Sequence, residues 1–541
     1  MIFALDYASP SVFESNRDRA LLGMSANARR PVRFHGQVVR NIPILRFTLR
    51  ALGEAIWSND TWLTQGELMS WMLDPVITVH PDRIFFEAFS QDQSVYAMVI
   101  ANPKMFTTDG EVVTGTTNVD FSAWLWGALN ELRSSRETWL RIGAEGFEVK
   151  TKGAGGRFEQ KVELPDSWVR GFLQVSSAMA MPGTRLTVRP ADLLAAIRFL
   201  RYTKAKVSPR AVRYEFKPGE EAQIVLEPWE HSIRLRGAEH NFTEPRIIRT
   251  WGRRRLNLIE LLLPFATSVD IYLKGRGLPS FYAVNLPDLT FVLGLSGWSD
   301  QSWTGTGSFD LLGDAAPVSE ELTAQAHQEL ANRFHASAKD LAAQLQQKPE
   351  LVGRACERLC RQGRAIFDVA SRDFRHRELF EQPVDEAKFF PPDERRERAQ
   401  ALLAKNAVPF ARCEPQETRK TKKLKTPDGP VTREIIYRDW RVTGNVATEK
   451  TEIVVGDSGR IIFGTCSCPF FQDNLLGKGP CEHMLALFQA SADGRKDLPT
   501  STAASTTASG KTSAADAAGA GEPEDEAEEE NVDEDQEEGK Q

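Results

Sequence analysis

Residues 466–483 read CSCPFFQDNLLGKGPCEH and contain Cys466, Cys468, Cys481 and His483. A Cys-x-Cys pair and a Cys-x-His pair are separated by a short loop with glycine and proline. A structural zinc ion takes four ligands in a tetrahedral arrangement, and three thiolates with one imidazole fill every position. The segment therefore predicts a closed structural site with these four residues as ligands and Zn²⁺ as cofactor. A disulfide and unligated thiols are the alternatives.

The residues around the ligands predict their local structure. Pro469 follows Cys468 directly and ends regular strand pairing there, so we expect the first pair on a turn. Residues two apart on a helix do not face one another, so Cys481 should precede a helix that has His483 in its first turn. Three strands are expected before the ligands, at 434–442, 450–455 and 460–463. Such a ββα unit buries little core, so metal binding would supply much of its folding free energy.

This ligand order, with Gly477 to Pro480 matching in part and an apolar helix after His483, resembles the SWIM-type zinc finger. The resemblance covers about 60 residues and implies a module that binds DNA or another protein. The long region ahead of the finger also looks like that of bacterial SWIM proteins, some of which accompany AAA-type ATPases and von Willebrand A-domain partners. That likeness implies, as an alternative, a protein adaptor without nucleic-acid contact.

Length predicts a multidomain protein, since 541 residues allow three or four domains, and runs of strands mixed with helices predict an α+β fold. The expected parts are a large mixed N-terminal region at 1–312, a helical winged-helix-like region at 317–410, a basic linker at 411–430, the finger at 431–492 and a disordered acidic tail at 493–541. Residues 521–541 carry twelve Asp or Glu against Lys540, a net charge of −11, so the rest of the chain has −7 + 11 = +4. No apolar run reaches the roughly 18 residues of a membrane span, and no export signal is recognisable, so we expect a cytoplasmic protein without membrane contact.

The middle region has the element order of a winged helix. Helices are expected at 318–334, 337–345 and 350–362, followed by a hairpin at 364–379. In a DNA-binding version the third helix enters the major groove. The candidate phosphate contacts are Arg354, Arg358, Arg361 and Arg364 from that helix and its end, and Arg372, Arg375 and Arg377 in the hairpin, or wing. A packing module with a solvated arginine face is the alternative.

A second basic stretch lies beside the finger, at residues 419–425. Its five cations in seven residues are Arg419, Lys420, Lys422, Lys423 and Lys425. Such a density of positive charge suits phosphate or an acidic surface, although short basic runs are also common in flexible linkers.

No catalytic motif is recognisable in the sequence. It has no glycine-rich loop with a phosphate-binding lysine, no Gly-x-Ser-x-Gly and no His-Glu-x-x-His. We therefore expect a non-enzymatic protein with no small-molecule substrate, which binds nucleic acid or another protein through its zinc module. The apolar residues 484–488 favour a protein partner, because that face must pack against something.

Overall fold

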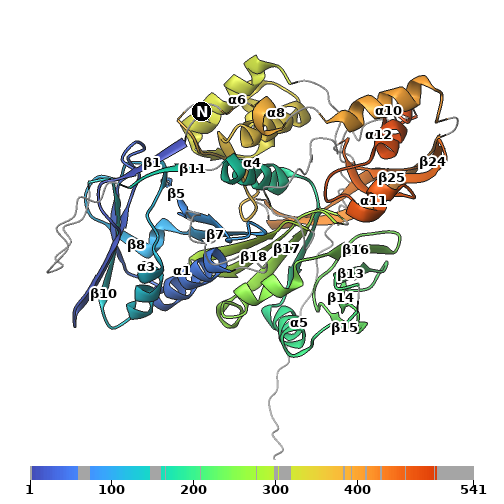
Figure 1. The fold of residues 1–541 in the computed structure, drawn as a ribbon. Coiled ribbons are helices and arrows are strands. Elements are labelled where there is room, and N and C mark those ends of the chain that lie inside the picture. Colours follow the sequence, from blue (N-terminus) through green and yellow to red (C-terminus); the bar gives the residue numbers. More distant parts are fainter. Residues whose placement is uncertain are drawn as a thin grey trace, which may run out of the picture. The chain divides into compact units, whose positions relative to one another are not determined.

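An eight-stranded antiparallel sheet forms the centre of the N-terminal body (Figure 1). In spatial order its strands are β12 (Thr184–Val188), β17 (Ser268–Leu273), β18 (Ser280–Leu286), β19 (Leu289–Leu295), β7 (Val95–Ala101), β6 (Ile84–Phe89), β5 (Val76–Val79) and β9 (Gly115–Asn118). The computed structural model describes residues 3–58, 74–145, 160–164, 166–207, 209–275, 277–297, 303, 318–381, 384, 386–390, 393–408, 411–426, 429–456, 459–492 and 494–495; among these it gives the backbone alone at 3–4, 123, 160–164, 386–387 and 418–438.

Both faces of this sheet are buried, which explains why its strands are apolar throughout. In β7, Val95, Ala97 and Val99 belong to one core cluster, whereas Tyr96 and Met98 belong to another. Side chains alternate between the faces of a strand, so two cores require a continuous apolar run. Helix α1 (Ile42–Trp57) covers the first face and helix α4 (Asp166–Ala180) the second.

Smaller sheets and helices complete the body. The five-stranded sheet has the order β2 (Val12–Ser15), β3 (Arg19–Ser25), β10 (Glu137–Gly143), β4 (Phe34–Val38) and β8 (Phe106–Thr108). The four-stranded sheet has the order β15 (His231–Arg234), β14 (Gln223–Leu226), β13 (Val212–Phe216) and β16 (Arg246–Thr250), and β1 (Phe3–Tyr7) pairs with β11 (Gln160–Leu164). The helices are α3 (Ala123–Ala128), α5 (Pro190–Tyr202) and the 3-10 helices η1 (Pro103–Met105), η2 (Leu129–Glu131), η3 (Arg253–Ile259) and η4 (Leu263–Phe265).

The middle region has the element order expected of a winged helix. It runs α6 (Glu320–Arg333), β20 (His335–Ala336), α7 (Ala338–Leu345), α8 (Pro349–Arg361), β21 (Ala365–Asp368) and β22 (Asp373–His376). As predicted, Ser337 caps the second helix, because its hydroxyl accepts from the backbone N–H of Asp340. The three strands form one sheet in the order β20, β22, β21.

Two arginines of the wing, the hairpin of β21 and β22 with the residues after it, lie inside the molecule, so the prediction that they contact phosphates is wrong. Arg375 is 1% exposed and pairs with Asp368 and Asp82, and Arg377 is 1% exposed and donates to Glu87 at 2.6 Å. Asp82 and Glu87 belong to the body, so these buried ion pairs join the wing to the eight-stranded sheet.

The finger sheet begins earlier than the sequence suggested. Its four antiparallel strands are β23 (Ala411–Thr426), β24 (Gly429–Val446), β25 (Glu449–Val455) and β26 (Ile461–Cys466). The expected linker at 411–430 is therefore corrected to a long strand and the start of its partner. Thr421 and Leu424 interrupt the cations, and the paired strand is rich in β-branched residues, a composition that suits strands.

The finger shares its core with the body. One buried cluster contains Phe172 of α4, Ile366 of the wing and Val442, Cys466 and Met484 of the finger. The loop after β17 approaches the finger at two glycines, Gly275 with φ +146° and Gly277 with φ +73°. A Cβ at Gly275 would lie 2.8 Å from the carbonyl oxygen of Ile462, so a larger residue there would push the finger away.

Helices α9 (Glu386–Phe389) and α10 (Glu394–Ala404) connect the winged-helix region to the finger. Within the described residues, no helix combines the length and the apolarity needed to cross a membrane. The expected acidic tail at 493–541 lies, apart from residues 494 and 495, outside the described part of the chain. The other domain boundaries stay predictions.

The buried pair between Arg377 and Glu87 should contribute strongly to stability. Arg377→Met leaves the Glu87 carboxylate buried without its cation, so we expect the free energy of unfolding to fall by about 3–5 kcal/mol. The matched control is Arg33→Met, because Arg33 pairs with Glu145 while both side chains are half exposed, and its loss should be below about 1 kcal/mol. Denaturant titrations followed by tryptophan fluorescence would measure the free energy of unfolding of both variants. Equal losses would contradict the stabilising role given to the buried pair.

Candidate metal centre

The end of β26 and the short helix α11 (Pro469–Asn474) carry the first two candidate ligands. Cys466 is the last residue of β26 and pairs with Thr451, whose Oγ1 lies 3.4 Å from the Cys466 Sγ. Cys468 is the N-cap of α11, and its Sγ accepts from the backbone N–H of Phe471 at 3.4 Å. Pro469 takes the first helical position, where a missing N–H is tolerated. The first pair thus lies on a turn between strand and helix, as predicted.

Helix α12 (Glu482–Ala490) carries the second pair. Cys481 is its N-cap and His483 lies in its first turn, as the spacing predicted. Cysteines at helix N-termini face unpaired N–H groups and the positive end of the helix dipole, which favour the thiolate. Two helix N-termini therefore support the negative charge that metal binding requires.

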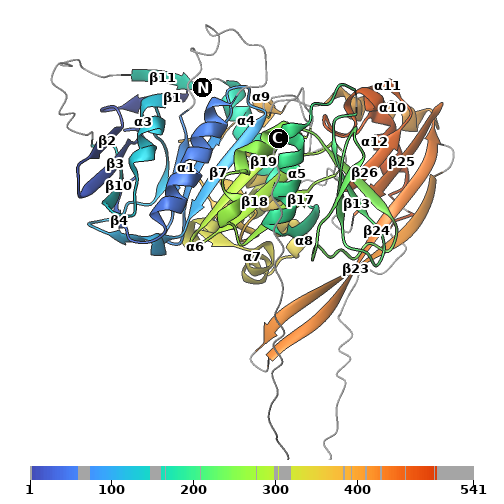
Figure 2. The same cartoon turned by 90° about the horizontal axis from the view of Figure 1, so that it is seen from below.

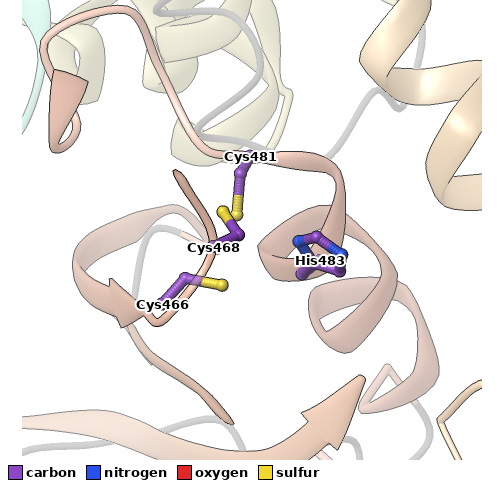
Figure 3. Close-up of side chains that lie close together, drawn as sticks. All are labelled: Cys466, Cys468, Cys481 and His483. Carbon is purple, nitrogen blue, oxygen red and sulfur yellow. The ribbon is translucent and has the colours of Figure 1, made fainter. Parts of the chain in front are cut away.

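The four side chains point toward one another (Figure 3). One donor atom from each residue lies within 4.8 Å of all the others. With zinc–sulfur bonds of about 2.3 Å, tetrahedral geometry sets sulfur atoms about 3.8 Å apart, so a contraction of at most about 1 Å completes the site. All three cysteines are at most 3% exposed.

A zinc ion would also satisfy a buried group that is otherwise unpaired. Nδ1 of His483 is buried and has no hydrogen-bond partner among the described residues. His483, a member of the cluster, thus carries a buried ring nitrogen to which the described residues offer no partner, as expected of a metal ligand. The residues present therefore fit zinc: three sulfurs and one nitrogen would hold it, and no position stays open for water or substrate.

Comparison with known proteins agrees with this geometry. Residues 452–492 match the family model of the SWIM zinc finger. This segment is a SWIM zinc finger. No curated protein matches the chain. Among solved structures, the proliferating cellular nuclear antigen of Entamoeba histolytica is similar at 11% identity and a TM-score of 0.31, over 48% of this chain and 97% of that one; a likeness this distant supports no inference.

The ligands of the SWIM finger influence each other's protons. A hydrogen bond with Cys481 lowers the pKa of Cys466 well below its usual value, and the same bond raises the pKa of Cys481. Burial raises the pKa of Cys468, and a hydrogen bond with Cys466 raises that of His483. Without metal the cluster therefore retains protons at neutral pH, and a dication must displace them.

A second cluster of possible metal ligands lies in the winged-helix region, where His327, His376 and Glu378 bring donor atoms within 4.8 Å. The positive charge of Arg364 disfavours a metal ion there, because its guanidinium lies 3.2 Å from Nδ1 of His327 and 3.4 Å from the Glu378 carboxylate. A guanidinium can only donate, so Nδ1 must accept and Nε2 must carry the proton that it gives to Glu378 at 2.5 Å. Neither nitrogen of His327 then offers a free lone pair.

This second cluster is therefore better described as an ion-pair network. Burial alone would raise the pKa of Glu378, but hydrogen bonds with His327 and His376 and the charge of Arg364 lower it overall. The cluster leaves no local motif in the sequence, since His327 and Glu378 lie 51 residues apart.

The arginines of α8 are engaged in the fold. The helix packs against α4, α6 and α7, and beyond Glu350 none of its residues is exposed. Arg358 pairs with Glu320 at 2.5 Å, the guanidinium of Arg361 lies 5.0 Å from the ring centre of Phe390, and Arg354 is partly buried. Nucleic-acid contact by these three arginines stays a prediction, and this packing argues against it.

The basic run at 419–425 lies in β23, within the long hairpin with β24. The strands pair from Ala411 with Gly444 to Thr426 with Gly429. Residues two apart share a face, so positions 420 and 422 lie on one face of this ribbon and 419, 423 and 425 on the other. The side chains of these five residues are outside the described part of the structure.

Zinc affinity of the SWIM finger should fall steeply with acidity. Because Cys468 and Cys481 have raised pKa values, binding near neutral pH must displace at least two protons. The affinity should then fall about 100-fold for each unit of decrease in pH. Competition with a chromophoric chelator between about pH 6 and about pH 8 would measure this; Cys413→Ser, outside the cluster, should leave the slope unchanged, and a flat profile for the wild type would contradict the assignment.

Proposed function

We propose that this protein binds nucleic acid through the β23–β24 hairpin, with the SWIM finger as the rigid base from which the hairpin extends. The observation that carries the proposal is the charge of the hairpin: residues 418–438 contain seven Lys or Arg and two Asp or Glu, a net charge of +5. Figure 2 shows this part of the hairpin extending away from the neighbouring elements.

The base of the hairpin is fixed to the body. The Thr243 hydroxyl donates to the carbonyl oxygen of Glu417 at 2.7 Å, and Gln416 donates to Glu244 at 2.9 Å. Arg246 also lies 3.7 Å from Asp439 in β24. These contacts fix the hairpin to the body as far as residue 417, and its basic run begins at residue 419.

A two-stranded ribbon with cations on both faces suits a nucleic-acid groove. The major groove of a duplex admits a two-stranded β-ribbon, and phosphates line both of its walls. Positions 420 and 422 would then serve one wall and positions 419, 423 and 425 the other. Phosphate contacts of this kind supply affinity and orientation without reading sequence.

The apolar residues of α12 no longer favour a protein partner over nucleic acid. That preference rested on an apolar face at residues 484–488, and all five of these residues are buried, where α12 packs against α10 and β25. An adaptor for an AAA-type ATPase or a von Willebrand A-domain partner stays a prediction that no described contact favours. We propose a binding rather than a catalytic role, in the cytoplasm, where reducing conditions suit six free cysteines.

Salt dependence tests the nucleic-acid proposal. Fluorescence anisotropy with a labelled DNA duplex and an RNA duplex, from about 50 to about 200 mM salt, should give an affinity that falls linearly on logarithmic axes. Changing Lys420, Lys422 and Lys423 together to Ala should weaken binding and reduce the slope by about one unit for each lost phosphate contact.

The matched control is Arg358→Ala, because Arg358 is paired within the winged-helix region. We expect the logarithm of its affinity to fall with the logarithm of the salt concentration at the same slope as for the wild type. Absent binding at the lowest salt, a slope near zero, or a hairpin variant that binds like the wild type would each refute the proposal.

A further inference from the structure

Helix α10 lies outside residues 452–492, yet it packs against the ligand-bearing helix α12 (Figure 1). By sequence it is a charged helix, but one of its arginines faces inward. Arg395 is 5% exposed, whereas the Arg398 side chain, one turn further along, is 50% exposed. A buried arginine in a polar helix needs a structural or functional reason, because its charge must be fully paired.

All three guanidinium nitrogens of Arg395 have partners. Nε donates to Asp393 Oδ1 at 2.9 Å, and Nη2 donates to the other oxygen of that carboxylate. Nη1 donates to the carbonyl oxygen of Pro480 at 3.0 Å, and the guanidinium lies 4.9 Å from the ring centre of Phe470. The bidentate pair with Asp393 fixes the plane of the guanidinium, so its third nitrogen has one direction in which to donate.

The two groups that Arg395 contacts belong to different halves of the ligand set. Pro480 immediately precedes Cys481, and Phe470 lies two residues after Cys468 in α11. A single guanidinium therefore contacts both the segment that carries Cys466 and Cys468 and the segment that carries Cys481 and His483. Groups that hold metal-ligating side chains in place typically affect metal affinity by about 10- to 100-fold.

We propose that Arg395, oriented by Asp393, is a positioning residue of the zinc site. Through this residue, helix α10 contributes to zinc binding by the SWIM finger in this chain. The pair of Arg395 with Asp393 is neutral, so its role is geometric and not the compensation of charge at the metal. Lysine should be a poor replacement, because one ammonium cannot hold the carboxylate in bidentate fashion and also reach the Pro480 carbonyl and the Phe470 ring.

The test compares zinc release from Arg395→Lys, Asp393→Asn and the control Arg398→Gln in the full-length protein. Asp393 also caps α10, and asparagine caps a helix about as well, so Asp393→Asn removes the charged partner and one acceptor while it keeps the cap. Arg398 lies 3.7 Å from Glu482 at the surface, so its replacement should change little.

We expect Arg395→Lys and Asp393→Asn to release zinc to a chelator about 10- to 100-fold faster than the wild type. The cobalt-substituted proteins should show shifted d–d and thiolate charge-transfer bands, a readout that a loss of general stability would not move. Arg398→Gln should match the wild type in both measurements.

Wild-type release rates in Arg395→Lys and Asp393→Asn would overturn the proposal. So would faster release that only follows a lower melting temperature while the cobalt spectra stay unchanged. Where Arg395→Lys fails to fold, Asp393→Asn alone decides between these outcomes. If the wild type itself retains no zinc, the metal assignment fails before the role of Arg395 is in question.

Discussion

The convergence of three thiols and one imidazole is the constraint on which the local arrangement of the finger depends. A strand end delivers Cys466, and the N-termini of α11 and α12 deliver Cys468, Cys481 and His483. Three thiols brought together in a nearly dry site repel one another once they ionise, and a dication removes that repulsion. The three cysteines also belong to the core cluster that includes residues of α4 and the wing, so they pack against the body as well as against each other.

This shared core changes what the metal is expected to do. An isolated finger of about 60 residues would depend on zinc for most of its folding free energy. Here the finger sheet packs on the body, and the loop with Gly275 and Gly277 approaches its backbone closely. We infer that zinc sets the local geometry around α11 and α12, and that the body supports the sheet. A hairpin whose base is held in this way keeps one orientation relative to the body, as the proposed groove binding requires.

Much of this organisation is predictable from the sequence, for identifiable reasons. The ligand spacing predicts both the turn at Pro469 and the helix after Cys481, because covalent geometry decides them locally. Caps and periodicity predict α6, α7 and α8 within about two residues.

Tertiary contacts decide the features that were not predictable. The basic run has the composition of a linker, and only its pairing with β24 shows that it is a strand. Three buried arginines, Arg375, Arg377 and Arg395, cannot be told from surface arginines in the sequence. Each has a partner far away in the chain: Asp82, Glu87 and the carbonyl of Pro480, respectively. Buried ion pairs between residues far apart in the chain leave no periodic pattern in the sequence from which they could be predicted.

X-ray absorption at the zinc edge of the purified protein tests the central claim most directly. The account predicts one zinc ion per chain, with about three sulfur atoms at about 2.3 Å and one nitrogen at about 2.0 Å. A protein without stoichiometric zinc, or a coordination shell that contains water oxygen in place of one of these ligands, would contradict it.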